Sequence, residues 1–308
     1  MERAPFVSVI IPNYNHAQYL EQRLYSVLNQ TYQDFEVIII DDKSTDNSLE
    51  IISRYKDDPH VSHLVINEVN SGNPFEQWTK GISLSKGEVV WIAESDDWCE
   101  LNMLEKLVAS FSKKKGCSIA YCNLSIVNEN GVLIEQGKEG RNQYFLGTQF
   151  IKRYLCLANI IRNSSCAIFS RKIASSISKD YEHFKGAGDY FFWVNLALKG
   201  NVAIVNLPLC YFRCHSNSVT SRRDSDGTNF FEEKIVFDFI LQKVHISWLR
   251  KQGALYYHWI RIINMEYDDK EIRMRLYQLW SIPFKYTLIQ LLVKEIQGYV
   301  RAKFNIYL

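Results

Sequence analysis

The chain has 308 residues, of which 47% are hydrophobic and 23% are charged, an ordinary globular composition that suits one main domain with an appendage. The formal net charge is only +2, so the chain has no overall basic field and the sequence predicts no nucleic-acid partner. The seven cysteines have neither an even count nor the CxxC spacing of a zinc site, and we expect most of them to be buried thiols.

The beginning of the chain resembles neither a signal peptide nor a membrane anchor. Residues 1–5 lead into a short β-like run instead of a long apolar stretch. No segment of the sequence reaches the roughly 20 apolar residues that cross a bilayer. The sequence therefore predicts a protein of the reducing cytoplasm.

The first half of the chain alternates strand and helix signals. Short apolar, β-branched runs predict strands, and segments with apolar residues at helical spacing predict helices. The predicted strands are 6–11, 35–40, 61–66, 89–93 and 119–124. The predicted helices are 17–30, 44–55, 75–84 and 101–111. Repeated βα units of this kind build a Rossmann-like α/β fold, in which helices flank a mostly parallel sheet.

The second half is less regular. Asn130-Gly131 between two apolar runs predicts a hairpin, and a helix over 189–198 precedes a strand over 202–207. Beyond about residue 225, the pattern changes to helices that are rich in aromatic residues, Lys and Arg. We therefore expect one domain over 1–225 and a helical, basic and aromatic region over 226–308.

Three polar motifs follow predicted strands at the edge where such sheets bind ligands. They are Asn13-Tyr14-Asn15, Asp41-Asp42 and Glu94-Ser95-Asp96-Asp97. Neighbouring carboxylates repel each other, and Mg²⁺ or Mn²⁺ relieves the conflict by taking one or two carboxylates together with water and phosphate oxygens. The acidic motif therefore indicates a metal site, with a solvated helix cap as the alternative.

The other two motifs at this edge suit a nucleotide. Asp42 can accept hydrogen bonds from a base or a ribose, or it can form a turn into the next helix. Tyr14 offers a ring face to a base, whereas Asn15 can simply cap a helix. A Gly-containing turn over 70–73 begins another helix and suits a phosphate, although a plain loop explains it equally.

Two segments of the second half carry further candidates. Gly188-Asp189 opens a helix inside an aromatic cluster, where a desolvated carboxylate gains the basicity of a general base, while an N-cap is the alternative. His215 can reach a metal or a diphosphate and Arg213 can add a cation, although a lone histidine is more often structural.

In this order, the motifs resemble the family 2 glycosyltransferases, which have the GT-A fold of nucleotide-diphospho-sugar transferases. The resemblance covers about residues 6–222. It rests on SVIIPNYN (8–15), FEVIIIDDKSTDNS (35–48), KGEVVWIAESDDW (86–98), GDYFFWVNLALKG (188–200) and YFRCHSNSVT (211–220).

The resemblance assigns roles to individual residues. It implies a nucleotide-binding half over 1–100, an acceptor half over 101–225, and Asp189 as the catalytic base. The implied nucleotide-binding residues are Pro12, Asn13, Tyr14, Asn15, Asp42, Ser71, Gly72, Lys80, Glu94, Ser95 and Asp96. The implied ligands of Mn²⁺ or Mg²⁺ are Asp96, Asp97 and His215. Glu94 and Gly188 depart from the family pattern, which has Asp and Glu at these positions.

The family implies an inverting, metal-dependent transfer of a hexosyl or N-acetylhexosaminyl group. The donor is a nucleotide-diphosphate sugar, by family habit a UDP-sugar, and the acceptor is a saccharide or lipid-linked saccharide of cell-surface polysaccharide synthesis. The alternative is a catalytically impaired sugar-nucleotide-binding or scaffold protein. A nucleotidyltransferase is disfavoured, because no Gly-rich loop with a basic residue follows the first strand.

The end of the sequence carries a separate prediction. From Lys270 onward, seven Lys or Arg stand against two Glu, interleaved with aromatic and aliphatic residues. Basic amphipathic helices of this kind lie on anionic membrane surfaces, which predicts contact of 270–308 with the inner face of the membrane. The alternative is packing on the main domain or on a second copy of the chain.

Overall fold

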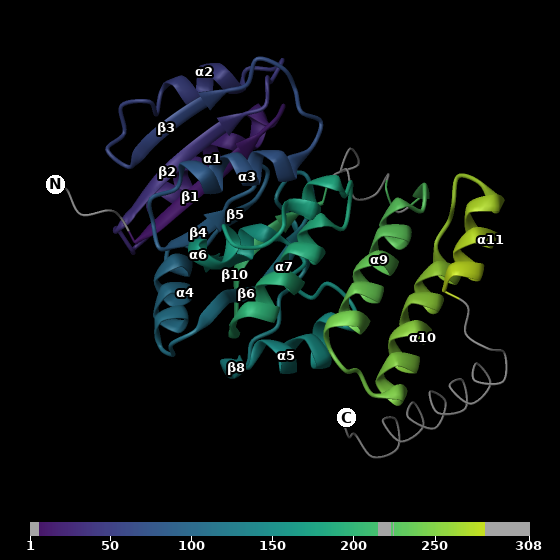
Figure 1. Cartoon of the computed structure of the whole chain (residues 1–308). Coiled ribbons are helices and arrows are strands. Elements are labelled where there is room, and N and C mark those ends of the chain that lie inside the picture. Colours follow the sequence, from purple (N-terminus) through teal and green to yellow (C-terminus); the bar gives the residue numbers. More distant parts are fainter. Residues whose placement is uncertain (1–5, 215–222, 224, 281–308) are drawn as a thin grey trace.

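One ten-stranded sheet forms the centre of the computed structural model, which describes residues 6–214, 223 and 225–280 (Figure 1). The strand order is β3-β2-β1-β4-β9-β6-β10-β5, with β7 paired to β6 and β8 paired to β10. Helices flank this sheet, and three further helices extend from one side of it. The predicted α/β fold class with a helical carboxyl-terminal region is confirmed.

The elements have the following bounds. The strands are β1 Val7–Asn13, β2 Phe35–Asp41, β3 Val61–Ile66, β4 Val89–Ile92, β5 Trp98–Cys99, β6 Cys117–Val127, β7 Leu133–Glu135, β8 Gln143–Phe145, β9 Ala167–Ser170 and β10 Asn201–Arg213. The helices are α1 Ala17–Leu28, α2 Ser48–Ser53, α3 Pro74–Leu84, α4 Met103–Ser112, α5 Gly147–Phe150, α6 Arg171–Ala174, α7 Gly188–Lys199, α9 Thr228–Lys243, α10 Trp248–Asn264 and α11 Lys270–Leu279. A π-helical turn over Ile151–Leu155 continues α5.

The first four strands form a parallel block. β1 lies between β2 and β4, and β3 lies outside β2. All residues of β1 and β2 are buried, as expected for parallel strands that are covered on both faces. Asn13 stands opposite Asp41, and the amide of Ala93 donates to the carbonyl of Ile10 at 2.8 Å. The carboxyl ends of these strands therefore place the three predicted polar motifs at one edge.

The second half of the sheet is mixed. β6 and β10 run parallel to each other, but β9 runs antiparallel between β4 and β6. The sheet therefore has two parallel blocks, β3-β2-β1-β4 and β6-β10, which the reversed strand β9 joins, and the short strands β5, β7 and β8 add antiparallel pairs. The predicted hairpin at Asn130-Gly131 is confirmed: β7 pairs with β6, and Gly131 has a φ of +79° in the left-handed region that this turn requires.

Helix α2 is shorter than the predicted 44–55. Ser44 does not begin the helix, because its amide and hydroxyl donate to the Asp41 carboxylate at 2.8 and 2.6 Å. Lys43 adopts a φ of +63°, which also keeps this stretch out of the helix. The residues after β2 therefore form a loop over the edge of the sheet instead of a helical turn.

The helical region has a core of its own and also joins that of the main domain. Phe230, Phe237, Leu276 and Trp280 are buried in the separate core, whereas Val236 of α9 belongs to the main one. Over 270–280, the structure thus places apolar side chains against α9 and α10. The rest of the predicted membrane segment, 281–308, lies outside the described residues. Among the described helices, none is long and apolar enough to cross a bilayer.

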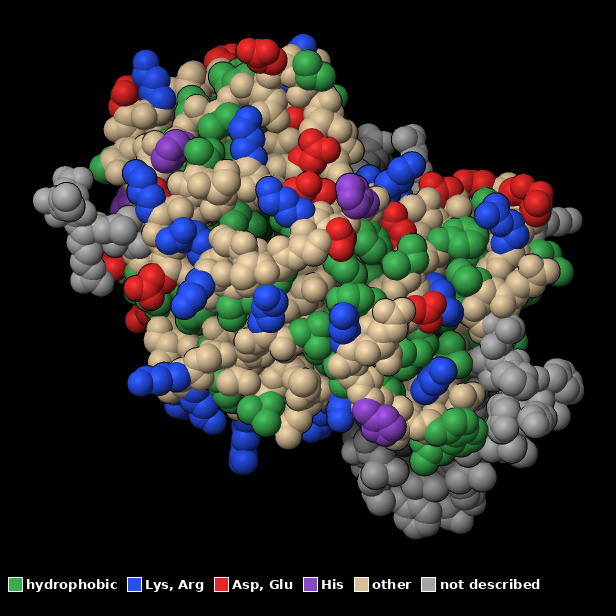
Figure 2. Space-filling model, viewed as in Figure 1, with side chains coloured by type: hydrophobic (Ala, Val, Ile, Leu, Met, Phe, Trp, Pro, Cys, Tyr) green, Lys and Arg blue, Asp and Glu red, His purple; other side chains and the backbone are tan. Residues whose placement is uncertain are grey.

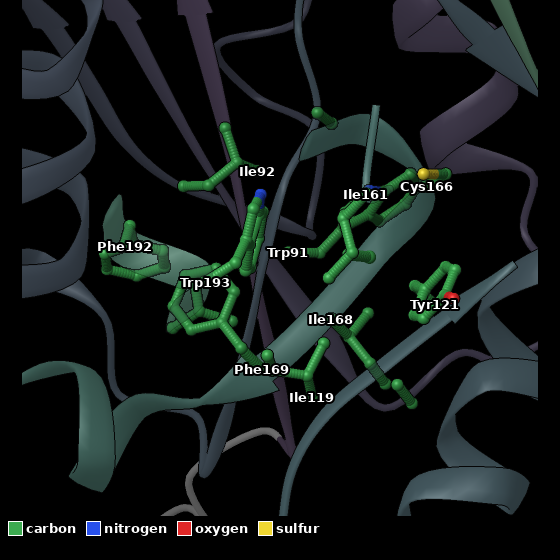
Figure 3. Close-up of a cluster of buried hydrophobic side chains, with 14 of the residues drawn as sticks. Trp91, Ile92, Ile119, Tyr121, Ile161, Cys166, Ile168, Phe169, Phe192 and Trp193 are labelled. Atoms are coloured by element: carbon green, nitrogen blue, oxygen red, sulfur yellow. The ribbon is translucent and has the colours of Figure 1, made fainter. Parts of the chain in front are cut away.

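Figure 2 shows charged side chains over the main domain and more hydrophobic side chains over the helical region. Figure 3 shows the centre of the core, where Trp91, Phe169 and Trp193 lie close together. Six of the seven cysteines are buried, as predicted, and Cys214 is exposed.

Candidate active site

The loops after β1 and β2 are held together by side-chain amides. Asn13 Nδ2 donates to Asp41 Oδ2 at 2.8 Å, and Asn15 Oδ1 accepts from the amide of Thr45 at 2.7 Å. Asn15 has a φ of +56° and bonds across to the neighbouring loop, so it does not cap α1, whose N-cap residue is His16. Between these anchors, the Tyr14 side chain is 45% exposed and presents its ring at the edge of the sheet.

Asp42 lies buried beside the next loop. Its carboxylate accepts from Asn67 Nδ2 at 2.6 Å, from Ser71 Oγ at 2.8 Å and from the Ser71 amide at 3.1 Å. Lys80 Nζ donates to Asn67 Oδ1 at 2.6 Å. The structure therefore brings the predicted Asp42, Ser71 and Lys80 together. Asn67 links Lys80 to Asp42, because it bonds to both side chains. The sequence analysis did not single out Asn67.

The start of α3 is fixed locally. Asn73 caps the helix by accepting from the Phe75 amide at 2.9 Å, and Pro74 occupies the first helical position, where its missing N–H costs nothing. Gly72 has a φ of +67° and donates its amide to Asn70 Oδ1 at 2.6 Å. The turn predicted to bind phosphate is thus an ordered loop against Asp42.

Glu94 begins the acidic loop after β4 and is held inside the protein. Its Oε1 accepts from Trp78 Nε1 at 3.1 Å and from Ser164 Oγ at 3.0 Å. Burial raises the pKa of Glu94 to about 8, and the charge of Asp96 adds to the rise. The longer arm of Glu, compared with the Asp of the family pattern, reaches these two donors. Ser95 is buried and its hydroxyl contacts His16 Nδ1 at 2.8 Å.

Asp97 is 1% exposed, and protein donors occupy both of its carboxylate oxygens. Oδ2 accepts from Ser165 Oγ at 2.7 Å and from Asn163 Nδ2 at 2.8 Å, and Oδ1 accepts from the Arg213 amide at 3.0 Å. Burial raises the pKa of Asp97, and Asp96 adds to this. Oδ1 keeps a lone pair beyond the Arg213 amide, so the predicted role of Asp97 as a metal ligand stays open. Through its hydrogen bonds, Asp97 also anchors the loop that carries the half-buried Asp96.

Two arginines support the acidic loop. Arg23 is fully buried on α1, donates to the Glu94 carbonyl at 2.7 Å, and lies 3.9 Å from Asp97 Oδ2. The guanidinium of Arg213 lies 4.4 Å from the ring centre of Tyr19 and donates to the Asp96 carbonyl at 2.8 Å. Arg213 thus braces the loop backbone. The sequence carries a signal for Arg23, since it lies on the apolar face of its helix.

A divalent cation suits the chemistry of this loop. Within the described part of the chain, no three His, Cys, Asp or Glu side chains converge as a metal site, and His215 lies outside it. Mg²⁺ and Mn²⁺ need only one or two carboxylates besides water and phosphate. The repulsion from Asp96 that raises the pKa of Glu94 indicates a site short of positive charge.

Asp189 lies at the second position of α7, so it is not the N-cap residue. Its carboxylate accepts from Asn159 Nδ2 at 2.8 Å and from the Tyr190 amide at 2.6 Å. Burial raises the pKa of Asp189 to about 7, although these hydrogen bonds oppose the rise. A carboxyl group of this kind is about half ionised at neutral pH, and its ionised form is basic enough to accept a proton.

The glycine before Asp189 is required by packing. A Cβ at position 188 would lie 2.5 Å from the Phe75 ring and 2.6 Å from the Tyr181 carbonyl. No side chain fits there, which explains why the Glu of the family pattern is missing. The aromatic ring of Phe75 occupies the neighbouring space and helps to desolvate this end of α7.

Helix α9 fixes the loop that leads to Asp189. Glu232 accepts from the backbone amides of Lys185, Gly186 and Ala187 at 2.7, 2.7 and 2.8 Å. A Cβ on Gly186 would lie only 1.8 Å from Asn229 Oδ1, so α9 packs directly on this loop. The helical region is therefore part of the candidate site. The residues in this contact are 45 or more positions apart in the sequence, and the sequence did not predict it.

The fold and the acidic loop at the carboxyl edge of its sheet define a sugar transferase of the GT-A type. The model of the family "Glycosyl transferase family 2" matches residues 8–178, more than half of the chain, and the chain belongs to this family. The resemblance inferred from the motifs is thereby confirmed.

Individual proteins of the family are similar over most of the chain. Hyaluronan synthase of Pasteurella multocida is 28% identical over 273 residues, which make up 88% of this chain but only 26% of the synthase. An Escherichia coli UDP-Glc:alpha-D-GlcNAc-diphosphoundecaprenol beta-1,3-glucosyltransferase is 27% identical over 264 residues, 86% of this chain and 96% of that enzyme. The structure of Staphylococcus aureus TarS 1–349 in complex with UDP-GlcNAc has a TM-score of 0.65 at 20% identity, covering 91% of this chain and 77% of that one.

Proposed function

We propose that the protein transfers a hexosyl or N-acetylhexosaminyl group from a UDP-sugar, with inversion, to a saccharide or lipid-linked saccharide in cell-surface polysaccharide synthesis. The observation that carries the proposal is Asp189, a half-buried carboxylate at the start of α7 that Asn159 holds and whose pKa is raised to about 7. Nearly all other members of the assigned set stand at the carboxyl edge of the same sheet.

Similar proteins support a UDP-sugar as the donor. The S. aureus neighbour was solved with UDP-GlcNAc, and the E. coli relative is named for UDP-Glc. In this chain, Asp42 and the exposed ring of Tyr14 would hold the base, since a buried carboxylate accepts imide or ribose hydrogen bonds and a ring stacks on a base.

The E. coli relative also suggests the acceptor. This enzyme is named for GlcNAc-diphosphoundecaprenol, a lipid-linked saccharide, whereas the P. multocida relative is named for the polysaccharide hyaluronan. Both are acceptors or products of cell-surface polysaccharide synthesis in bacteria. A lipid-linked acceptor would also suit a protein that contacts the membrane.

The reaction would proceed in one displacement. Asp189 removes the proton of the acceptor hydroxyl while that oxygen forms a bond to the anomeric carbon, and the bond from this carbon to the diphosphate breaks on the opposite face. The proton ends on Asp189 and the electron pair on the nucleoside diphosphate. Asn159 orients the base through its hydrogen bond, so positioning supplies much of the rate enhancement.

We propose Asp96 as the carboxylate that holds Mg²⁺ or Mn²⁺, with Asp97 and His215 as further ligands. When bound, the cation would neutralise the negative charge on the departing diphosphate. Titration of EDTA-treated protein with Mn²⁺ tests this assignment, because Asp96→Asn should weaken Mn²⁺ binding far more than Asp46→Asn, a substitution on the neighbouring loop.

The donor can be tested directly. UDP-, GDP- and dTDP-sugars are added with Mn²⁺ to the full chain, and the midpoint of thermal unfolding is measured, since a ligand that binds only the folded state raises it. We expect UDP-sugars to give the largest rise, and release of UDP to follow when an acceptor is supplied. A larger rise with another nucleotide would refute the donor assignment.

The second candidate is a sugar-nucleotide-binding protein without transfer activity, favoured by the missing carboxylate at Gly188. It predicts the same thermal shift but no UDP release with any acceptor. The matched control is Asp189→Asn, which in an active enzyme stops UDP release and leaves nucleotide binding unchanged.

A further inference from the structure

A second candidate site lies away from the catalytic base. A cavity of about 700 Å³ opens between the end of β8, the π-helical turn after α5 and the turn that joins α9 to α10. Four of the lining side chains are basic or histidine, namely Lys152, Arg153, His245 and Arg250, and no acidic residue is among the described lining residues. Phe145 and Ile246 provide apolar wall.

This cavity is separate from the active site. Gly147, at the start of α5, packs against the backbone of Ala197 and Gly200, at the carboxyl end of α7. Asp189 lies at the opposite end of α7, a helix of 12 residues and therefore roughly 18 Å long. In Figure 1, the turn between α9 and α10 lies at the lower end of the helical region, next to α5.

The start of α10 is arranged for an anion. The first turn of a helix carries partial positive charge and normally favours acidic residues. Helix α10 has none there, and its third and fourth residues are Arg250 and Lys251. Ser247 makes no side-chain cap, and Arg250 Nε is buried without a hydrogen-bond partner among the described residues. A phosphate in the cavity would satisfy both the helix end and these cations.

Two exposed apolar residues follow the lining residue Ser247 along the chain. Trp248 is 55% exposed and Leu249 is 76% exposed, and neither of them lines the cavity itself. Figure 2 shows hydrophobic side chains beside a histidine at this end of the helical region. Large exposed apolar side chains next to cations are typical of proteins that insert into the interface of an anionic membrane.

We propose that this cavity binds the phosphate of an anionic phospholipid headgroup and that Trp248 and Leu249 enter the lipid interface beside it. The cations supply the attraction to the phosphate, and the exposed Trp248 and Leu249 favour a headgroup in a membrane over free phosphate in water. This surface belongs to the described part of the chain, and it is distinct from the basic segment at the end of the sequence. The proposal does not depend on the sugar donor.

Flotation of the full chain with lipid vesicles tests the proposal. We expect binding to vesicles that contain phosphatidylglycerol and much weaker binding to phosphatidylcholine alone. Each cation near an anionic surface contributes about five-fold in affinity, so Lys152→Gln with Arg250→Gln should lower vesicle binding about 25-fold. The matched control is Lys56→Gln with Lys172→Gln, which removes the same charge from exposed sites elsewhere.

Further variants keep the test independent of folding. Lys152→Glu changes one exposed side chain and should also weaken vesicle binding. Leu249→Ser should weaken it as well, whereas the control Ile134→Ser, at an exposed position of β7, should leave it unchanged. UDP release with a soluble acceptor should be unchanged in all of them, which separates this proposal from the proposed reaction. Equal vesicle binding by cavity and control variants would overturn the proposal. So would a thermal shift with inorganic phosphate that Lys152→Glu removes while vesicles do not bind.

Discussion

Replacing Asp189 by Asn should remove the proposed catalytic base and at the same time stabilise the protein. Asn has nearly the same shape, and the structure can accept its N–H₂ group. Asn159 Oδ1 is buried without a partner among the described residues, so after rotation of its amide it can accept from the new side chain. The oxygen of the new Asn can still accept from the Tyr190 amide.

The magnitude follows from the pKa. Burial raises the pKa of Asp189 from its ordinary value of 3.8 to about 7. The folded chain therefore binds the proton more tightly than the unfolded chain, and stability falls as the pH rises through this range and stays low above it. This rise corresponds to a cost of about 4 kcal/mol for ionising Asp189 in the folded protein. That cost is the upper limit for the increase in the free energy of unfolding of Asp189→Asn at pH 8.

Urea denaturation of the wild type and of Asp189→Asn at pH 4 and pH 8 measures this effect. We expect the variant to be more stable at pH 8, with a difference that nearly vanishes at pH 4, and to have lost transfer activity. Asp46→Asn is the contrasting control. Burial raises the pKa of Asp46, but hydrogen bonds from Ser48 and the Ala17 amide outweigh burial and lower it. Replacing Asp46 should therefore destabilise the folded protein at pH 8. A pH-independent difference for Asp189→Asn would refute the reasoning.

Three other substitutions test the site. Glu232→Gln loses the charge that accepts three backbone amides, so transfer should fall at least ten-fold while the dissociation constant of UDP, measured by calorimetry, stays within two-fold. Asp42→Asn should weaken UDP binding about ten-fold without lowering the rate at saturating donor, which steady-state kinetics would show. Gly188→Ala should cost about 1–3 kcal/mol in urea denaturation, because its methyl group would meet the Tyr181 carbonyl, and an unchanged midpoint would contradict the packing argument.

The first half of the fold followed from the sequence because its strands are buried on both faces. Continuous apolar runs such as 37–40 leave few alternatives, and the polar residues that follow them then fall at one edge of the sheet. Strand β9 was not predicted, because it has only four residues and they do not alternate between apolar and polar. Its antiparallel place between β4 and β6 depends on tertiary pairing, which no local pattern carries.

The sequence analysis named the titratable residues of the candidate site but not the residues that form hydrogen bonds with them. Asp42 and Asp189 stand at element ends, where position along the chain already suggests a role. Asn67, Asn159 and Glu232 lie in unremarkable segments, and their contacts span 25 to 47 residues. Such partners emerge only once the chain is folded.

The Glu232 contact also orders events in time. A growing chain emerges amino-terminal end first, and domains begin to fold as they appear. Residues up to about 213 contain the sheet and the acidic loop, but the amides of 185–187 find their carboxylate only when α9 has been synthesised. During synthesis, the loops proposed to bind the donor can therefore form before the loop that leads to Asp189 is fixed.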